Sequence, residues 1–238
     1  MGVFRAVALA VVLASPLGAA GAAPQDEDKK KVEDLEKQVT ELLRRVKALE
    51  DQVASLKKTA NPAAAEAAAG AIAANEKAAG ATLKTLATAE ADFRTNDRDG
   101  NGIHDYWVGD VSGLYRYLNN NKELKLIDRA IADADASPLK ASSLTVLKHD
   151  QPIPRSGYLF AALPKFVEKE KPEAYHTGGF RNTHHFGIAA YPVEYGKSGK
   201  MTFVISETNI LWKKDLGGKA PDLFPENPAK DDWEKATD

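Results

Sequence analysis

The feature that most constrains this chain is a repeat of valine and leucine between Lys29 and Lys58. Spacings of three and four residues alternate, so every valine falls at heptad position a and every leucine at position d: Val32, Leu35, Val39, Leu42, Val46, Leu49, Val53 and Leu56. An apolar seam of two positions per heptad is too narrow to bury itself in a monomer, so this helix needs a partner. Residues 29–60 are therefore predicted to form a coiled-coil stalk, roughly 38 Å long at 1.5 Å per residue over the repeat.

The partner that this repeat predicts is a second copy of the chain. β-Branched residues at position a with leucine at d favour a parallel homodimer, whereas Leu43 at position e widens the stripe and keeps a homotrimer open. Lys31 with Glu36, and Arg45 with Glu50, stand at g and e positions that pair between strands, although exposed pairs contribute little. A solvated single helix, or one packed on the chain's own following domain, is the alternative.

The N-terminus predicts export. A positively charged start, Met1 to Arg5, precedes an apolar run, Ala6 to Leu17, and a small-residue cleavage pattern ends at Ala22. Residues 1–22 are therefore predicted to be a cleaved signal peptide that directs the protein to the periplasm, the cell surface or the medium. Contact with a membrane is expected only if the signal stays uncleaved, and the apolar run is shorter than the roughly 20 residues that a spanning helix needs.

Composition excludes several classes of function. The chain has 32 basic and 34 acidic residues, which gives no concentrated basic face for nucleic acid, so no nucleic-acid partner is expected. It has no cysteine, which excludes disulfides, thiolate zinc sites and a cysteine nucleophile.

Residues 63–217 are predicted to form an α+β domain, with 218–238 as an irregular tail. An alanine-rich helix is expected from Ala63 to Phe93, after a break at Asn61-Pro62. Short helices that begin at Asp110 and Asp128 follow, each capped by that aspartate. The expected strands are 157–163, 186–194, 201–206 and 210–214, the last three in an antiparallel meander, whereas 165–182 is expected to be a long exposed loop.

Between this helix and the strands, the loop from Asn96 to Trp107 has the spacing of a calcium site. Its predicted ligands stand at loop positions 1, 3, 5, 7 and 9, with the carbonyl group acting at position 7: Asp97, Asp99, Asn101, Ile103 and Asp105. Gly102 permits the sharp turn, but Val108 replaces the closing glutamate, so an EF-hand is not supported. The predicted affinity for calcium is weak, on the order of 10⁻⁴ to 10⁻³ M. A plain Asx- and Gly-rich turn without an ion is the alternative.

Catalytic residues are not identified. His176, His184 and His185 lie close in sequence, but adjacent residues on a strand point to opposite faces, so zinc binding is not expected. Lys197 to Lys200 is predicted to be a hairpin turn rather than a phosphate loop, because a strand and not a helix follows it. Glycosidase carboxylates leave little trace in a sequence, so a secreted hydrolase or carbohydrate-acting enzyme remains an alternative.

The order of these parts resembles a known family. The helix N-E-K-A-A-G-A-T-L-K-T-L-A-T-A-E-A-D-F (75–93) leads into D-R-D-G-N-G-I-H-D-Y (97–106), and Y-G-K-S-G-K-M-T-F-V-I (195–205) forms a hairpin. This resembles the soluble half of type IV pilins and major pseudopilins, and more closely an uncharacterised secreted bacterial family with that head. The resemblance implies a helix packed on an antiparallel sheet, no enzymatic activity and a calcium ion that braces the head. A signal peptide and a charged coiled coil replace the processing site and hydrophobic helix of pilins, which favours a soluble oligomer over a filament.

The sequence therefore predicts a non-enzymatic exported structural or scaffold protein, with a pilin-like head on an oligomerising coiled coil. A calcium-dependent adhesion or ligand-binding module is a further alternative, whose sign would be an exposed aromatic patch at Tyr106 and Trp107.

Overall fold

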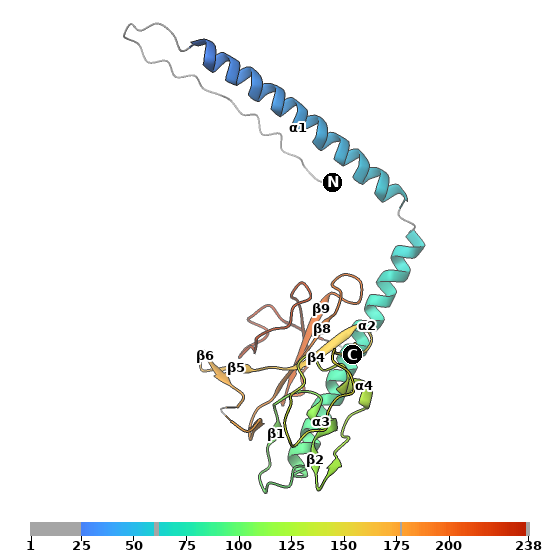
Figure 1. The fold of residues 1–238 in the computed structure, drawn as a ribbon, viewed down its shortest axis with the longest axis vertical. Coiled ribbons are helices and arrows are strands. Elements are labelled where there is room, and N and C mark those ends of the chain that lie inside the picture. The colour runs from blue at the N-terminus through green and yellow to red at the C-terminus, as the bar shows by residue number, and fades with distance from the viewer. Residues whose placement is uncertain (1–24, 60–61, 177, 237–238) are drawn as a thin grey trace, which may run out of the picture. The chain divides into compact units, whose positions relative to one another are not determined.

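A computed structural model describes residues 25–59, 62–176 and 178–236. The chain divides into two compact units, Met1–Ala60 and Asn61–Asp238. The described part of the first unit is a single helix, α1 (Gln25–Thr59), which covers the heptad repeat (Figure 1). The second unit begins with helix α2 (Pro62–Thr95). Helix α1 ends at Thr59 and α2 begins at Pro62, so the two are separate elements, as the proline predicts.

The second unit, here called the head, packs α2 on an antiparallel sheet (Figure 1). This sheet has the order β12-β10-β9-β8-β4, and its strands are β4 (Tyr158–Ala162), β8 (Gly187–Pro192), β9 (Met201–Ser206), β10 (Trp212–Asp215) and β12 (Glu234–Lys235). Helix α2 contacts the central strands β8 and β9. The predicted α+β class, with a long helix packed on a small antiparallel sheet, is confirmed.

One face of α2 supplies the core of the head. Ala79, Leu83, Leu86 and Phe93 are buried there and recur at the three- and four-residue spacing of a helix face. The N-terminal half of the helix is attached to the β8–β9 turn, because Asn75 donates to the Ser198 carbonyl group at 2.9 Å. The predicted hairpin turn at 195–200 is therefore confirmed, and it forms a docking point for α2.

The meander of β8, β9 and β10 has the expected antiparallel pairing. Strand β9 is more buried than the predicted half-buried strand, because Thr202, Val204 and Ser206 are buried as well as Phe203. The segment after β10 covers this second face, where the Thr202 hydroxyl group donates to the Lys219 carbonyl group at 3.0 Å.

Short elements connect α2 to this sheet. They are β1 (Tyr106–Trp107), α3 (Gly113–Arg116), β2 (Leu118–Asn119), β3 (Lys122–Glu123) and α4 (Arg129–Ala132). The expected aspartate cap forms at one of the two helices. Asp110 accepts the backbone N–H of Gly113 at 2.8 Å, whereas Asp128 makes no side-chain cap bond to α4.

The expectation of a long loop at 165–182 is wrong. This segment forms the hairpin of β5 (Lys165–Glu168) and β6 (Lys171–Ala174), followed by β7 (Arg181–Asn182), which pairs with β1. The turn residues Lys169 and Glu170 both have positive φ, as a two-residue hairpin turn requires. Glu226 accepts both of their backbone N–H groups. The sequence did not predict this hairpin, because its strands are rich in charged residues and lack the alternation of apolar and polar residues that marks a strand.

The expectation of an irregular tail is also corrected. Strand β11 (Leu223–Phe224) pairs in parallel with β5, and β12 pairs with β10. Trp233, the expected anchor, is buried in the core. Strands of two residues are too short to leave a periodic pattern, so only the anchoring tryptophan was predictable.

The central position of α2 gives a first prediction. Leu86→Ala should lower the free energy of unfolding by about 2–5 kcal/mol, because Leu86 is fully buried and the alanine leaves a cavity. Urea denaturation followed by tryptophan fluorescence measures the loss. Val146→Ala is the matched control, since Val146 is exposed and its truncation should change stability by no more than about 0.5 kcal/mol. Equal losses in the two variants would contradict the assigned core.

Candidate functional site

The candidate site is the loop that connects the end of α2 to β1. Asp97 has a positive φ of 43°, and Gly100 and Gly102 follow with φ of 69° and 80°, so the chain turns sharply here. The Asp97 carboxylate accepts the backbone N–H groups of Asn101 at 3.1 Å and Gly102 at 3.0 Å. Asp97 thus stabilises the turn itself.

Asp99, Asn101 and Asp105 lie together inside this turn. The Asn101 side-chain amide donates to Asp99 Oδ2 at 2.9 Å and to Asp105 Oδ2 at 3.4 Å. The side chains of Asp99 and Asp105 are only 3% and 5% exposed. Among the described residues, no donor reaches the other oxygen of either carboxylate, Asp99 Oδ1 or Asp105 Oδ1. Two buried carboxylate oxygens are therefore unsatisfied, which is a costly arrangement.

Arg181 brings the opposite charge to the loop from β7. Its Nε lies 2.8 Å from Asp99 Oδ2 and 3.7 Å from Asp105 Oδ1. The guanidinium group stacks on an aromatic cluster, with its carbon 4.3 Å from the centre of the Trp107 ring and 5.0 Å from that of Tyr117. Sequence reasoning missed Arg181, because it is far along the chain from the loop and only the pairing of β7 with β1 brings it close.

One arginine does not balance the charge of this loop. Burial raises the pKa of the Asp105 carboxyl above its usual value, and the negative charge of Asp99 adds to that effect, while the hydrogen bond from Asn101 opposes it. The ionised form of Asp105 is thus destabilised where it stands. A further cation beside it would lower that cost.

The five predicted ligands are only partly assembled. Asp99, Asn101 and Asp105 converge, whereas Asp97 faces backbone N–H groups, and the Ile103 carbonyl group accepts the Asp105 N–H at 3.1 Å. Within the described part of the chain, no three carboxylate or imidazole groups are arranged to hold a metal ion. A metal would therefore also need oxygen ligands from amide, carbonyl or water.

The aromatic residues beside the loop do not form an exposed patch. Trp107 is 2% exposed, and its indole N–H donates to Asp110. Tyr106 packs on Phe186, with ring centroids 5.0 Å apart, and the Arg94 guanidinium group lies over its ring. The expected sign of an adhesion surface is therefore corrected, since the pairing of β1 with β7 places Trp107 in the core.

Glu90 on α2 is another buried acid near the loop. Its carboxylate accepts the backbone N–H of Trp107 at 3.0 Å, which connects α2 to β1. Burial raises the pKa of Glu90 well above its usual value, and this hydrogen bond opposes the shift only partly.

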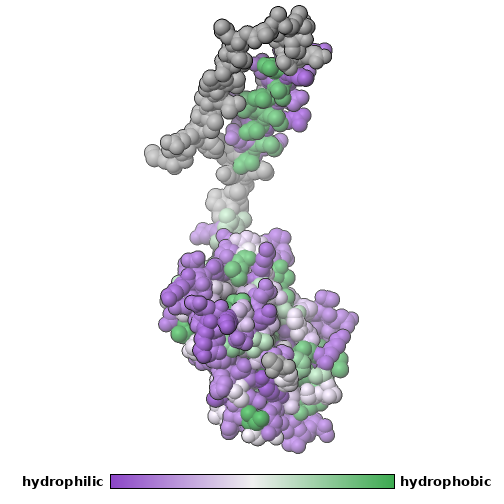
Figure 2. All heavy atoms as spheres, turned by 90° about the vertical axis from the view of Figure 1, so that its left-hand side faces the viewer, coloured by the Kyte–Doolittle hydropathy of each residue, from purple (hydrophilic) through white to green (hydrophobic). Residues whose placement is uncertain are grey.

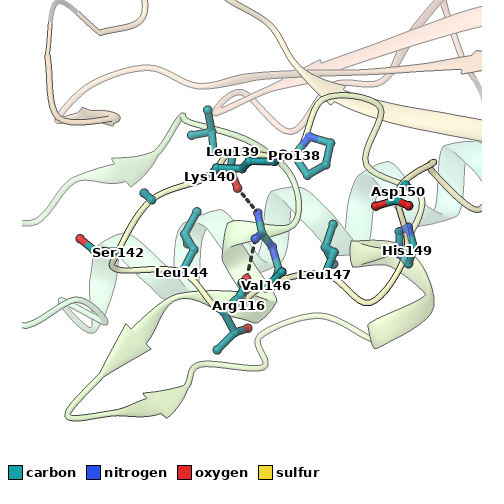
Figure 3. A pocket seen from close by; sticks show the side chains of 12 residues that line it. Arg116, Pro138, Leu139, Lys140, Ser142, Leu144, Val146, Leu147, His149 and Asp150 are labelled. Atoms are coloured by element: carbon teal, nitrogen blue, oxygen red, sulfur yellow. Dashed lines mark hydrogen bonds between the residues drawn. The ribbon is translucent and has the colours of Figure 1, made fainter.

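A second buried charge cluster surrounds Arg116. Arg116 and Asp110 are 4% and 1% exposed, and Arg116 Nη2 lies 2.8 Å from Asp110 Oδ2. The same guanidinium group donates to the carbonyl groups of Leu139 and Thr145 (Figure 3). Burial, and then repulsion from Asp110, raises the pKa of Asp135 to about 6. No local motif marked this cluster, because its members come from separate segments.

A cavity of about 550 Å³ lies beside Arg116, and Figure 3 shows its walls. Its lining is mostly apolar, with His149 and Asp150 at one end. Asp110 and Asp135 do not line it. These two carboxyl groups are thus buried and do not open onto this cavity.

The histidines of the β5–β9 region make separate contacts. His185 Nδ1 lies 2.8 Å from Glu207 Oε1, and its ring packs on Phe166. The ring of His176 contacts Phe180 instead. The ring of His184 lies 6.1 Å from that of His185. Among the described residues, the three histidines do not form a group that could hold a metal ion.

The apolar seam of α1 is a second candidate site. Its described members and Leu43 are between 48% and 65% exposed: Val32, Leu35, Val39, Leu42, Leu43, Val46, Leu49 and Val53. Figure 2 shows them as an apolar strip along a hydrophilic helix. Leu56 lies outside the described side chains. On the polar face, Arg44 and Arg45 both pair with Glu41.

No helix among the described residues is long and apolar enough to span a membrane. The predicted signal peptide, residues 1–22, lies outside the described residues.

Comparison with known proteins gives a family match. A family model described as "Protein of unknown function (DUF2950)" matches residues 57–232. Neither a curated protein nor a solved structure matches the chain.

The buried ion pair gives a second prediction. Arg116→Met should lower the free energy of unfolding by about 3–5 kcal/mol, because it leaves the Asp110 carboxylate buried without its cation. Arg98→Met is the matched control, since Arg98 pairs with Asp92 at the surface and its loss should cost no more than about 1 kcal/mol. Chemical denaturation measures both, and a cost for Arg116→Met no larger than that of the control would contradict the assignment.

The raised pKa of Asp135 gives a third prediction. As pH rises from about 4 to 6, the unfolded chain releases the Asp135 proton before the folded chain does, so this group lowers stability progressively across that window. Relative to Asp135→Asn, the wild type should lose about 2–3 kcal/mol between these pH values and run parallel above them. Parallel stability profiles of the two proteins from pH 4 to 7 would show that Asp135 is not perturbed.

Proposed function

The chain belongs to the DUF2950 family of proteins of unknown function, and we propose that it is a non-enzymatic, exported scaffold protein. In this proposal, α1 joins copies of the chain through a parallel coiled coil, and each copy presents one head. The family match begins at residue 57, so it covers the head and excludes nearly all of the heptad repeat. The head is the part common to the family, and α1 is the part that sets how many heads are held together.

The observation that carries this proposal is the exposed seam of α1. Burying a valine or leucine side chain stabilises a protein by about 1.5–3 kcal/mol. Every a and d side chain of the seam would be buried in this way on association with a second helix. A parallel coiled coil needs β-branched residues at position a and leucine at position d on each strand. Helix α1 has both, so two copies of it meet this requirement. A second copy of the chain is therefore the partner that best matches the seam.

Charge complementarity supports the parallel direction. In parallel strands, position g of one helix lies beside position e of the next, where Lys31 meets Glu36 and Arg45 meets Glu50. Arg45 pairs with Glu41 within the single helix, so assembly would exchange or share that contact. The exchange costs little, because both residues are exposed.

The interior of the head supports a structural rather than a catalytic role. Its buried charged groups donate to or accept from other parts of the protein: Glu90 from Trp107, Arg116 to Asp110, and Asp135 from Ser112. These contacts connect segments that are distant in sequence, and the carboxylates are not open to the cavity. These contacts therefore make the head rigid, as a scaffold that presents its surface would require.

Export is part of the proposal on the basis of residues 1–22. The pilin-like resemblance also remains part of it, supported by the packing of α2 on an antiparallel sheet. Assembly into a pilus-type filament is not proposed, since a charged helix stands where pilins have a hydrophobic one.

A substitution in the seam tests this function. Leu42→Ser with Leu49→Ser should convert an oligomer of the mature chain into a monomer, because two adjacent d positions lose their apolar contacts. Light scattering coupled to size-exclusion chromatography measures the mass. Lys37→Ser with Asp51→Ser changes two f positions on the opposite face and should leave the oligomer intact. A wild-type protein that is monomeric at tens of micromolar would contradict the proposal.

A further inference from the structure

We propose that the loop between α2 and β1 binds a calcium ion beside Asp99 and Asp105, with Arg181 holding Asp99 in place. The starting observation is the pair of buried, unsatisfied oxygens, Asp99 Oδ1 and Asp105 Oδ1. A carboxylate oxygen that has lost water and has no donor is strongly unfavourable in a protein interior. Proteins satisfy such oxygens with a donor, a water molecule or a cation.

Charge balance favours a divalent cation. The loop contains the carboxylates of Asp97, Asp99 and Asp105, and the positive group in contact with Asp99 and Asp105 is Arg181. Arg98 is also in the loop, but its charge is paired with Asp92 of α2 and both are left out of the count. Three negative charges and one positive charge leave a deficit that one divalent ion would neutralise. The end of α2 at Thr95 adds to the preference for a cation, because the C-terminal end of a helix carries partial negative charge.

The ligand chemistry indicates calcium rather than a transition metal. Every candidate ligand is oxygen, from carboxylate, side-chain amide or backbone carbonyl, and the chain has no cysteine. Calcium takes 6–8 oxygen ligands in a flexible geometry, whereas magnesium demands a near-ideal octahedron. The loop supplies fewer protein ligands than a closed calcium site, so water completes the shell and the affinity is weak, on the order of 10⁻⁴ to 10⁻³ M.

Asn101 is the residue whose contacts change on binding. In the structure, its side-chain amide nitrogen donates to both Asp99 and Asp105. The cation would bind next to this amide nitrogen. Rotation of this amide exchanges its nitrogen for its oxygen and turns the donor into a ligand. Asp97 keeps the turn closed through the N–H groups of Asn101 and Gly102, and its carboxylate retains lone pairs for the ion.

Arg181 is a positioning residue in this site. Its Nε binds Asp99 Oδ2 at 2.8 Å, which leaves Asp99 Oδ1 for the cation. Its guanidinium group is fixed by the rings of Trp107 and Tyr117. An ion held here would connect the end of α2 with β1 and β7, so calcium should stabilise the whole head rather than the loop alone.

The test uses the full mature chain. Raising calcium chloride from zero, in EDTA, to 10 mM should increase the melting temperature by about 3–5 °C, as expected for roughly tenfold saturation over a millimolar dissociation constant. Terbium is a second probe, because an ion at Asp99 is close enough to Trp107 for excitation of the indole to sensitise terbium emission. Calcium should displace terbium and remove that emission.

Matched variants locate the site. Asp99→Asn with Asp105→Asn should abolish both the melting shift and the terbium emission. Glu194→Gln with Asp215→Asn changes net charge by the same amount at exposed carboxylates of another part of the head and should keep both responses. Far-ultraviolet circular dichroism in EDTA confirms that each variant is folded.

Two results would overturn the proposal. One is a wild-type melting curve that is the same in EDTA and in 10 mM calcium, which would leave the plain turn as the correct interpretation and does not depend on any variant being folded. The other is a full calcium response in the folded Asp99→Asn, Asp105→Asn variant. The oligomeric state enters neither result, so this site and the scaffold function can fail separately.

Discussion

The head depends on the burial of Trp107. Its backbone N–H binds Glu90 of α2, its indole N–H binds Asp110 before α3, and its ring lies under the Arg181 guanidinium group of β7. Gly113 stands so close to the indole that any side chain there would collide with it. This one residue thus connects β1 to α2, to the segment before α3 and to β7, through its backbone, its indole N–H and its ring.

The loop proposed to bind calcium is part of this buried network around Trp107. Buried charges restrict how the segments can be arranged, since each must keep its hydrogen-bond partner. In the loop of Asp99 and Asp105, two buried carboxylates share one guanidinium group, that of Arg181. The proposed cation there would complete the charge balance beside Trp107 and stiffen the head that, in the proposed scaffold, α1 presents.

The sequence predicts those parts of the structure that repeat. The seam of α1, the apolar face of α2 and strand β9 all show a periodic pattern, so the α+β class and the meander were predictable. The hairpin of β5 and β6 was not, because its strands are charged. Arg181 was not predictable either, since it reaches the loop only because β7 pairs with β1. Asp97 matched the spacing of a calcium ligand, but its carboxylate accepts backbone N–H groups of the turn, which the spacing does not reveal.

The central claim is that α1 joins copies of this chain in parallel register, and disulfide trapping tests it most directly. The chain has no cysteine, so Leu35→Cys and Leu49→Cys each introduce a single thiol. In a parallel coiled coil, each d position faces its own equivalent, and both variants should form a cross-linked dimer under mild oxidation. An antiparallel pair would place each d position opposite an a position of the other strand, with Leu35 near Val53 and Leu49 near Val39, and would trap neither variant alone. The absence of cross-links in both variants would contradict the claim.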